Sequence, residues 1–173
     1  MKLVGIIDED FVNYRKPAMV LEFPYCDFKC MKECGMQICQ NLPLASLPII
    51  EVSPSTLIQR YINNPITEAI VMQGLEPLSP QSIDDVIKFI FELRYQVHNS
   101  VDIVIYTGYE NDEIIDTIKR LKCAFNNQYS ANNGKLIIKF GRFKPNEQYH
   151  YDEVLGVNLA SSNQYGEIII DNN

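Results

Sequence analysis

The stretch "EAIVMQGLEPLSPQSIDDVIKFIFELRYQVHNSVDIVIYTG", residues 68–108, predicts a strand, a helix and a second strand in that order. Its two ends, 68–74 and 101–108, are apolar runs that terminate in Gly, which is typical of strands buried on both faces. Between them, apolar residues recur at helical spacing from Ile83 to Val97, after a Pro-containing start. This order predicts a right-handed βαβ unit with two parallel strands.

Apolar runs of similar length occur on both sides of this unit. Each is bounded by polar, Pro or Gly residues, which favours strands. Two further segments have the spacing of amphipathic helices, and the second has acidic residues in its first turn. The additional strands are predicted at 2–7, 18–23, 136–141 and 166–171, and the additional helices from Ser53 or Ser55 to about Asn63 and over 111–125.

The alternation of strands and helices predicts an α/β fold with a mainly parallel sheet of βα units. The chain has 173 residues, 46% hydrophobic and 21% charged, so we expect a single domain over residues 1–173. Ligand sites in such sheets form at the carboxyl ends of the strands. Four polar loops follow predicted strands: the cysteine-rich loop after 18–23, "QGLEPL", "TGYE" and "GRF". The sequence therefore predicts one site where these loops meet.

The composition argues against two classes of partner. A net charge of −7 and a pI near 4.8 disfavour nucleic acid, whose binding relies on Lys and Arg. No apolar stretch is long enough to cross a bilayer, and the acidic residues 8–10 interrupt the N-terminal run before a signal-peptide core forms. We therefore expect a cytoplasmic protein without a membrane partner, in which thiols stay reduced.

Four of the five cysteines gather in "CDFKCMKECGMQIC", residues 26–39. Their CxxxCxxxCxxxxC spacing lacks the two CxxC pairs common in structural zinc sites, and the expected compartment disfavours disulfides. Soft thiolates are the usual ligands of iron–sulfur clusters, which suit this segment better. Four thiolates would saturate a [4Fe–4S] cube, whereas three would leave one iron open for a substrate; the spacing is compatible with both. Cys123 is expected to be a small core residue of its helix, and His98 and His150 are expected at the surface.

The chain resembles a known family in the order of its loops. It carries a cysteine loop after an early strand, followed by "GLEPL", "YTGY", "GRF" and "LGVNLASSNQ". In this order it is similar to the radical S-adenosylmethionine activating proteins of anaerobic ribonucleoside-triphosphate reductases, from about residue 19 to residue 169. The resemblance implies a short partial (β/α) barrel, a [4Fe–4S] cluster and S-adenosylmethionine as cofactors. It also implies a larger glycyl-radical enzyme as the partner and a reduced flavodoxin- or ferredoxin-type electron donor.

The resemblance assigns the cluster ligands by the family pattern CxxxCxxC. Cys26 and Cys30 match its first two cysteines. Cys34 lies one residue too far for the third, whereas Cys39 has the flanks of the usual third ligand, Ile38 before it and Gln40-Asn41 after it. We therefore predict Cys26, Cys30 and Cys39 as ligands after a loop insertion, with Cys34 as the alternative third ligand. If both bound, the open iron would be closed.

The resemblance also implies where S-adenosylmethionine binds. Gly74, Leu75 and Glu76 match the family segment that contacts the methionine amino group, with Leu75 in place of a second Gly, and Thr107 matches a strand-end Thr-Gly. The alternative is a purely structural role, in which these residues end strands and form turns without binding a cofactor. Other functions compatible with the sequence are a radical enzyme acting on another peptide or metabolite, and a [4Fe–4S] or zinc binding module without catalysis.

Overall fold

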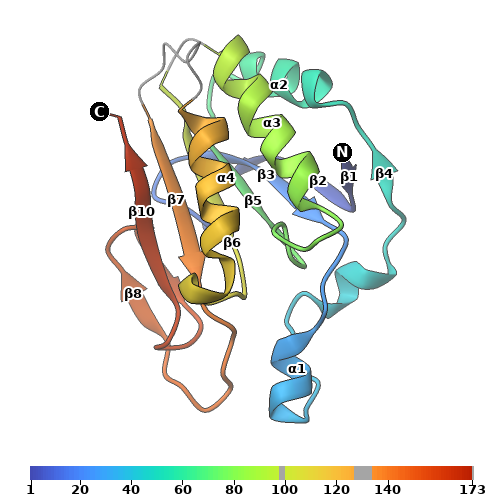
Figure 1. Cartoon of the computed structure of the whole chain (residues 1–173), viewed down its shortest axis with the longest axis vertical. Helices are drawn as coiled ribbons and strands as arrows, with labels where there is room; N and C mark the ends of the chain where they lie inside the picture. The colour runs from blue at the N-terminus through green and yellow to red at the C-terminus, as the bar shows by residue number, and fades with distance from the viewer. Residues whose placement is uncertain (98–99, 127–133, 173) are drawn as a thin grey trace.

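The computed structural model describes residues 1–97, 100–126 and 134–172, and in them the chain forms a six-stranded sheet (Figure 1). The strand order is β10-β7-β6-β5-β3-β2. Its four central strands run parallel, and the two edge strands are antiparallel to their neighbours. The strands are β2 (Gly5–Asp10), β3 (Ala18–Phe23), β5 (Ala69–Gly74), β6 (Asp102–Tyr106), β7 (Lys135–Phe140) and β10 (Tyr165–Asp171). The predicted α/β fold with a largely parallel sheet is confirmed; within the described residues the sheet does not close into a barrel.

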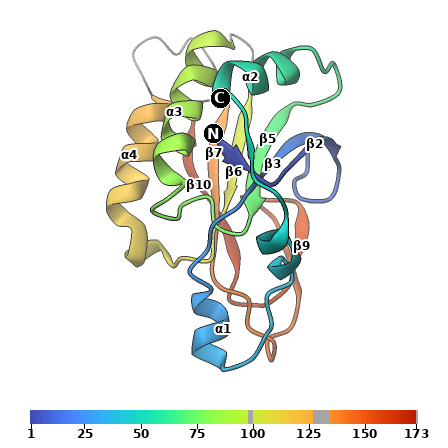
Figure 2. The ribbon, with the colours of Figure 1, turned by 90° about the vertical axis from the view of Figure 1, so that its right-hand side faces the viewer.

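Three helices cover one face of this sheet: α2 (Pro54–Ile62), α3 (Ile83–Gln96) and α4 (Ile115–Phe125) (Figure 2). On the other face, the turn between β2 and β3 packs with a small hairpin, β8 (His150–Asp152) and β9 (Val157–Leu159). A fourth helix in the described residues, α1 (Lys29–Cys34), lies apart from these layers, beyond the carboxyl ends of the parallel strands. The remaining short elements are β1 (Lys2–Leu3), β4 (Ile50–Glu51), η1 (Leu42–Ser46) and η2 (Asn111–Ile114).

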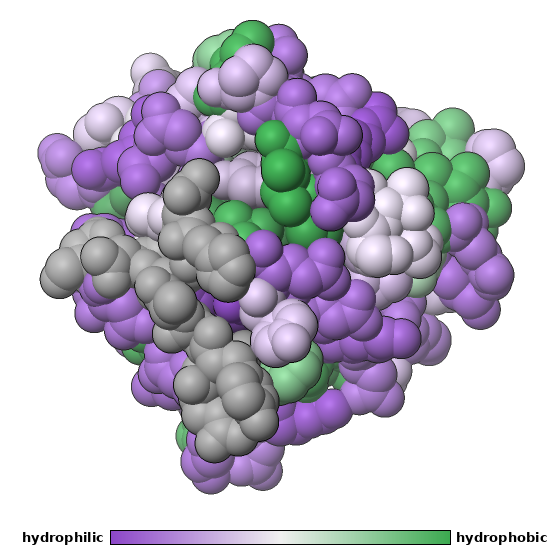
Figure 3. Space-filling model, turned by 90° about the horizontal axis from the view of Figure 1, so that it is seen from above, coloured by the Kyte–Doolittle hydropathy of each residue, from purple (hydrophilic) through white to green (hydrophobic). Residues whose placement is uncertain are grey.

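The end of the molecule opposite α1 is mostly hydrophilic, with apolar side chains in small groups (Figure 3). Within the described residues, no helix combines the length and the apolar character that a membrane span requires.

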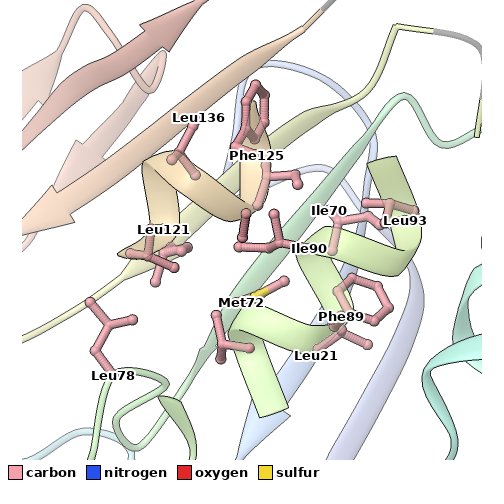
Figure 4. Close-up of a cluster of buried hydrophobic side chains, with 14 of the residues drawn as sticks. Leu21, Ile70, Met72, Leu78, Phe89, Ile90, Leu93, Leu121, Phe125 and Leu136 are labelled. Atoms are coloured by element: carbon pink, nitrogen blue, oxygen red, sulfur yellow. The ribbon is translucent and has the colours of Figure 1, made fainter. Parts of the chain in front are cut away.

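The main core lies between the helices and the sheet (Figure 4). Leu21 and Met72 on the strands meet Phe89 and Ile90 of α3 and Leu121 of α4, and none of the five side chains is exposed to solvent. Alternate strand residues point to the opposite face, where they form a second, smaller cluster under the β8–β9 hairpin. The central strands are thus buried on both faces, which explains their continuous apolar runs.

Most predicted elements are observed close to their expected bounds. Ser53 caps α2, because its hydroxyl accepts a hydrogen bond from the Thr56 backbone N–H at 3.1 Å. The expected strand over 2–7 is divided, because residues 2–3 pair with β4 whereas residues 5–10 pair with β3. The expected helix over 111–125 begins as the 3₁₀ turn η2. His98 and most of the loop after α4 lie outside the described residues.

Two expectations about single residues are wrong. Cys123 is exposed, because the inner face of α4 is formed by Ile118, Leu121 and Phe125, and position 123 lies on the outer face. His150 is half-buried in β8 rather than in a surface loop. Neither residue had a strong sequence signal, since one Cys in an amphipathic helix fits either face.

We predict that Gly74→Ala destabilises the protein strongly. Gly74 has φ +99°, and an added Cβ would lie 2.7 Å from the backbone nitrogen of Phe23 on the neighbouring strand. The free energy of unfolding should fall by about 2–3 kcal/mol in urea denaturation, because both strain and a backbone clash arise. Gly108→Ala is the control: its Cβ would meet nothing closer than 3.6 Å. Equal losses in the two variants would contradict this explanation.

Candidate functional site

The carboxyl ends of β3, β5, β6 and β7 surround a cleft of about 320 Å³. Its walls come from the cysteine loop (residues 24–41), from the loops after β5, β6 and β7, and from β9. These segments are far apart in sequence and meet because parallel strands end at the same edge of the sheet. The cleft therefore occupies the position that the sequence predicted for a site.

The cleft brings together three of the four cysteines in the cysteine loop. Cys26, Cys30 and Cys39 all line it. Cys34 does not line it; it lines an adjoining hollow, which shares Cys30 and Arg142 with the cleft. The Cys34 Sγ lies 3.3 Å from the carbonyl oxygen of Met36, within its own loop. The predicted triad thus lines one cavity, and the alternative third ligand lines its neighbour.

Burial makes two of these thiols poor acids. It raises the pKa of Cys26 to about 11, although the backbone N–H of Phe28 donates to the Cys26 Sγ at 3.2 Å and opposes the rise. Burial also raises the pKa of Cys30, and the neighbouring Cys39 adds to the effect. A metal must therefore displace the protons of these thiols on binding, so its affinity will rise with pH.

Phe28 has φ 53° and ψ 34°, and it is the one described residue other than Gly with a positive φ. This conformation is unusual for an aromatic residue, and such strain is concentrated at functional sites. Here it starts α1 and directs the Phe28 N–H at the Cys26 sulfur. Hydrogen bonds to ligand sulfurs tune iron–sulfur clusters.

No group of three or more His, Cys, Asp or Glu in the described residues is arranged to hold a single metal ion. An iron–sulfur cluster binds each thiolate at a different iron, so its ligands lie farther apart than those of one ion. Three thiols distributed around one cleft suit that donor set. Cys26, Cys30 and Cys39 are thus the residues available at this cleft to hold a cluster.

Glu76 is the central polar group of the cleft and is only 4% exposed. Its Oε1 accepts hydrogen bonds from the Thr107 hydroxyl at 2.8 Å and the Leu78 N–H at 3.0 Å. Its Oε2 accepts one from the Gly108 N–H at 2.8 Å. Burial nevertheless raises the pKa of Glu76 to about 7. The carboxyl group joins the ends of β5 and β6 and keeps acceptor capacity at Oε2.

The other predicted cofactor-binding residues differ in position. Gly74 and Leu75 line the cleft, and Leu75 needs no positive φ, so the missing second Gly causes no strain. Thr107 does not line the cleft; its buried hydroxyl supports Glu76 and accepts a hydrogen bond from the Tyr109 N–H. The turn expected from a purely structural role is also observed, since the Ser79 N–H donates a hydrogen bond to the Glu76 carbonyl.

Lys139 and Asn41 are among the polar residues of the cleft that were not predicted. Lys139 is 7% exposed and lines the cleft beside Tyr106, its direct partner across β6 and β7. Burial lowers the pKa of Lys139 to about 8, opposed by Glu76, and its Nζ donates to the Gly141 carbonyl at 2.8 Å. Asn41 donates to the Gly74 carbonyl at 2.7 Å and so attaches the cysteine loop to β5. A lone Lys inside the apolar run "LIIKF" was the available signal for Lys139.

The tail motif "SSNQ" contributes local hydrogen bonds. Asn163 donates to the Arg142 carbonyl at 2.9 Å, and the Gln164 amide donates to the Gly141 carbonyl at 3.3 Å. These bonds hold the loop after β7 against the cleft. Gly141 is tightly packed there, since an added Cβ would lie 2.8 Å from the Asn163 carbonyl oxygen.

Comparison with models of known protein families, with curated proteins and with solved structures found no match.

We predict that the buried Glu76 makes stability depend on pH. Folding raises its pKa from 4.5 to about 7, so the protonated carboxyl stabilises the fold at low pH, and this contribution is lost as the pH rises through 7. The unfolding free energy of Glu76→Gln minus that of wild type should therefore increase by about 2–3 kcal/mol from pH 5 to pH 8, because only wild type loses stability over this range. Urea denaturation at both values measures this, with the exposed-site variant Glu51→Gln as control. A difference independent of pH would exclude this effect.

Proposed function

We propose that this chain is a radical S-adenosylmethionine enzyme, with a [4Fe–4S] cluster on Cys26, Cys30 and Cys39. The observation that carries the proposal is the convergence of these three thiols and the buried Glu76 carboxyl on one cleft. The loop order that resembles the activating proteins of anaerobic ribonucleotide reductases adds to it. The side chain of Cys34, the thiol that could close the cluster, faces a different hollow.

The fold is consistent with a short partial (β/α) barrel of the radical S-adenosylmethionine type. In the part of the chain that the structure describes, its parallel strands carry helices on one face. The opposite face, at the carboxyl ends of β5, β6 and β7, contributes Gln73, Tyr106 and Lys139 to the cleft. In a partial barrel this is the concave face, where a cofactor and a substrate would lie.

The cluster, when bound, supplies one electron to the sulfonium of S-adenosylmethionine, which yields methionine and a 5′-deoxyadenosyl radical. The residues of the chain bind, orient and shield the reactants. Cys26, Cys30 and Cys39 would hold the cluster, and an iron without a thiolate would be available to the methionine amino and carboxylate groups. Glu76, through the spare acceptor capacity of Oε2, accepts a hydrogen bond from the ammonium group. Lys139 places a positive charge near Glu76 and favours its ionised form.

By resemblance, the product radical abstracts a hydrogen atom from a backbone glycine of a larger anaerobic ribonucleotide reductase. A reduced flavodoxin- or ferredoxin-type protein would supply the electron. Iron and sulfide content after anaerobic reconstitution, followed by release of 5′-deoxyadenosine under reducing conditions, tests the proposal. Zinc without iron would indicate a binding module, and cleavage without transfer to a reductase would indicate another peptide or metabolite substrate.

The ligand assignment makes a prediction for paired variants. Cys39→Ala should lose most of the reconstituted iron and the spectral response to S-adenosylmethionine, because Cys39 lines the cleft. Cys34→Ala should retain both, because its sulfur lies outside the cleft and bonds within its own loop. Iron analysis and electron paramagnetic resonance measure the two outcomes. The reverse result would assign the third ligand to Cys34.

The role of Glu76 makes a second prediction, for binding rather than for iron. Glu76→Gln should retain the cluster but bind S-adenosylmethionine about tenfold to a hundredfold more weakly, the effect of losing a hydrogen bond between charged groups. In wild type, binding should strengthen as the pH rises through about 7, because the carboxyl ionises there. Calorimetric titration across pH 6–8.5 measures both effects. Normal, pH-independent binding in the variant would contradict the role.

A further inference from the structure

The helix that carries Cys30 has almost no apolar attachment to the rest of the protein. None of the residues of α1 (Lys29–Cys34) is buried. Both ribbon views show it beyond the end of the sheet (Figures 1 and 2). Because Cys30 must stay at the cleft to bind a cluster, some other interaction has to fix the helix.

That interaction is an ionic contact with Glu113. The Lys29 ammonium group on α1 donates to the Glu113 carboxylate. The same carboxylate accepts two contacts from Arg142, of 2.7 Å at Oε2 and 3.0 Å at Oε1. Glu33, also on α1, completes the network at 3.7 Å from Lys29 and 4.0 Å from Arg142.

Glu113 is itself rigidly held. It belongs to η2, the turn that precedes α4, and its carboxylate also accepts the Glu110 N–H at 2.9 Å in a capping box. Although partial burial opposes the shift, hydrogen bonds from Lys29, the Glu110 N–H and Arg142 lower the pKa of Glu113 to about 2. Glu113 is therefore ionised at neutral pH, and its carboxylate bridges a cation on α1 and a cation in the loop after β7.

Arg142 connects Glu113 to the cleft, because it pairs with Glu113 and also lines the cleft. Its side chain is 10% exposed, lines both the cleft and the second hollow, and lies over the Tyr109 ring at 5.7 Å. Its Cγ and the Glu76 Oε2 lie equally close to a Cβ built on Gly108, at 3.6 Å. The position of the Arg142 guanidinium thus depends on Glu113, while its stem borders the residue proposed to bind the ammonium group.

We propose that Glu113 is a positioning residue that seats the cluster-binding helix, by joining Lys29 of α1 and Arg142 of the loop after β7. This inference rests on the proposed function, because α1 binds a cluster only if that function holds. Glu113 itself contacts neither the thiols nor the cleft. Its removal has two consequences. The helix opens more often, and two cations near the thiolates lose their compensating charge, which favours the more negative, reduced state of a cluster.

The first test uses the metal-free full-length chain and does not depend on a cluster. Trypsin needs an extended backbone, so cleavage after Lys32 requires local unfolding of α1, which the contact between Lys29 and Glu113 opposes. In Glu113→Gln this cleavage, followed by mass spectrometry, should be about tenfold faster, because a hydrogen-bonded ion pair is lost from a local opening equilibrium. Asp112→Asn removes an exposed carboxylate one residue away and should leave the rate unchanged. Equal rates in Glu113→Gln and wild type would overturn the proposal.

Salt supplies an independent check in the wild-type chain. Raising the ionic strength screens partly exposed ion pairs, so cleavage after Lys32 should accelerate in wild type. It should change less in Glu113→Gln, which keeps only the longer contact of 4.0 Å between Glu33 and Arg142. Cleavage in wild type that does not respond to salt would overturn the proposal even if the variant folded poorly.

The second test uses the reconstituted protein and its reduction potential. Glu113→Gln should raise the midpoint potential of the cluster relative to wild type and to Asp112→Asn, because Lys29 and Arg142 then keep only their longer contacts with Glu33. An unchanged potential would overturn the electrostatic part of the proposal. Failure of wild type to assemble a cluster would count against the proposed function alone, since the proteolysis result stands without it.

Discussion

The parallel pairing of β3, β5, β6 and β7 is the constraint on which the rest of this structure depends. It sends the chain out of the sheet four times at the same edge, so residues from Val12 to Gln164 share one cleft. The strands can be packed this way because their apolar runs are buried on both faces, under helices on one side and the β8–β9 hairpin on the other. The edge itself is left free for polar residues.

Burial of polar groups at this edge is what gives the cleft its chemistry. Glu76 and Lys139 are both nearly inaccessible, and desolvation moves their pKa values toward each other, to about 7 and about 8. Three hydrogen bonds compensate Glu76, and one to a backbone carbonyl compensates Lys139. The pKa values of both groups therefore lie close to neutral pH, so a small change in their surroundings changes their charge. A cationic ligand would shift the balance toward the ionised carboxylate.

The sequence predicted the sheet well because long apolar runs and amphipathic helices follow from burial alone. It could not predict α1, β8 or β9, which have six residues or fewer and no periodicity. At the site, it placed Gly74, Leu75 and Glu76 on the cleft but also Thr107, whose hydroxyl supports Glu76 instead. Spacing left Cys34 and Cys39 undecided, because side-chain direction in an irregular loop depends on tertiary contacts such as that from Asn41 to Gly74. Lys139 was missed because Glu76 and Tyr106, beside which it lies, are far away in the sequence, and Glu113 was missed because Lys29 is equally distant.

The central claim is that three thiols hold a cluster with one open iron at this cleft. Electron paramagnetic resonance of the reduced, reconstituted protein, before and after addition of S-adenosylmethionine, tests it most directly. We expect a reduced [4Fe–4S] signal that changes shape when the cofactor is added, because the ligand would bind the open iron. A signal that the cofactor leaves unchanged, or a protein that takes up zinc in place of iron, would contradict it.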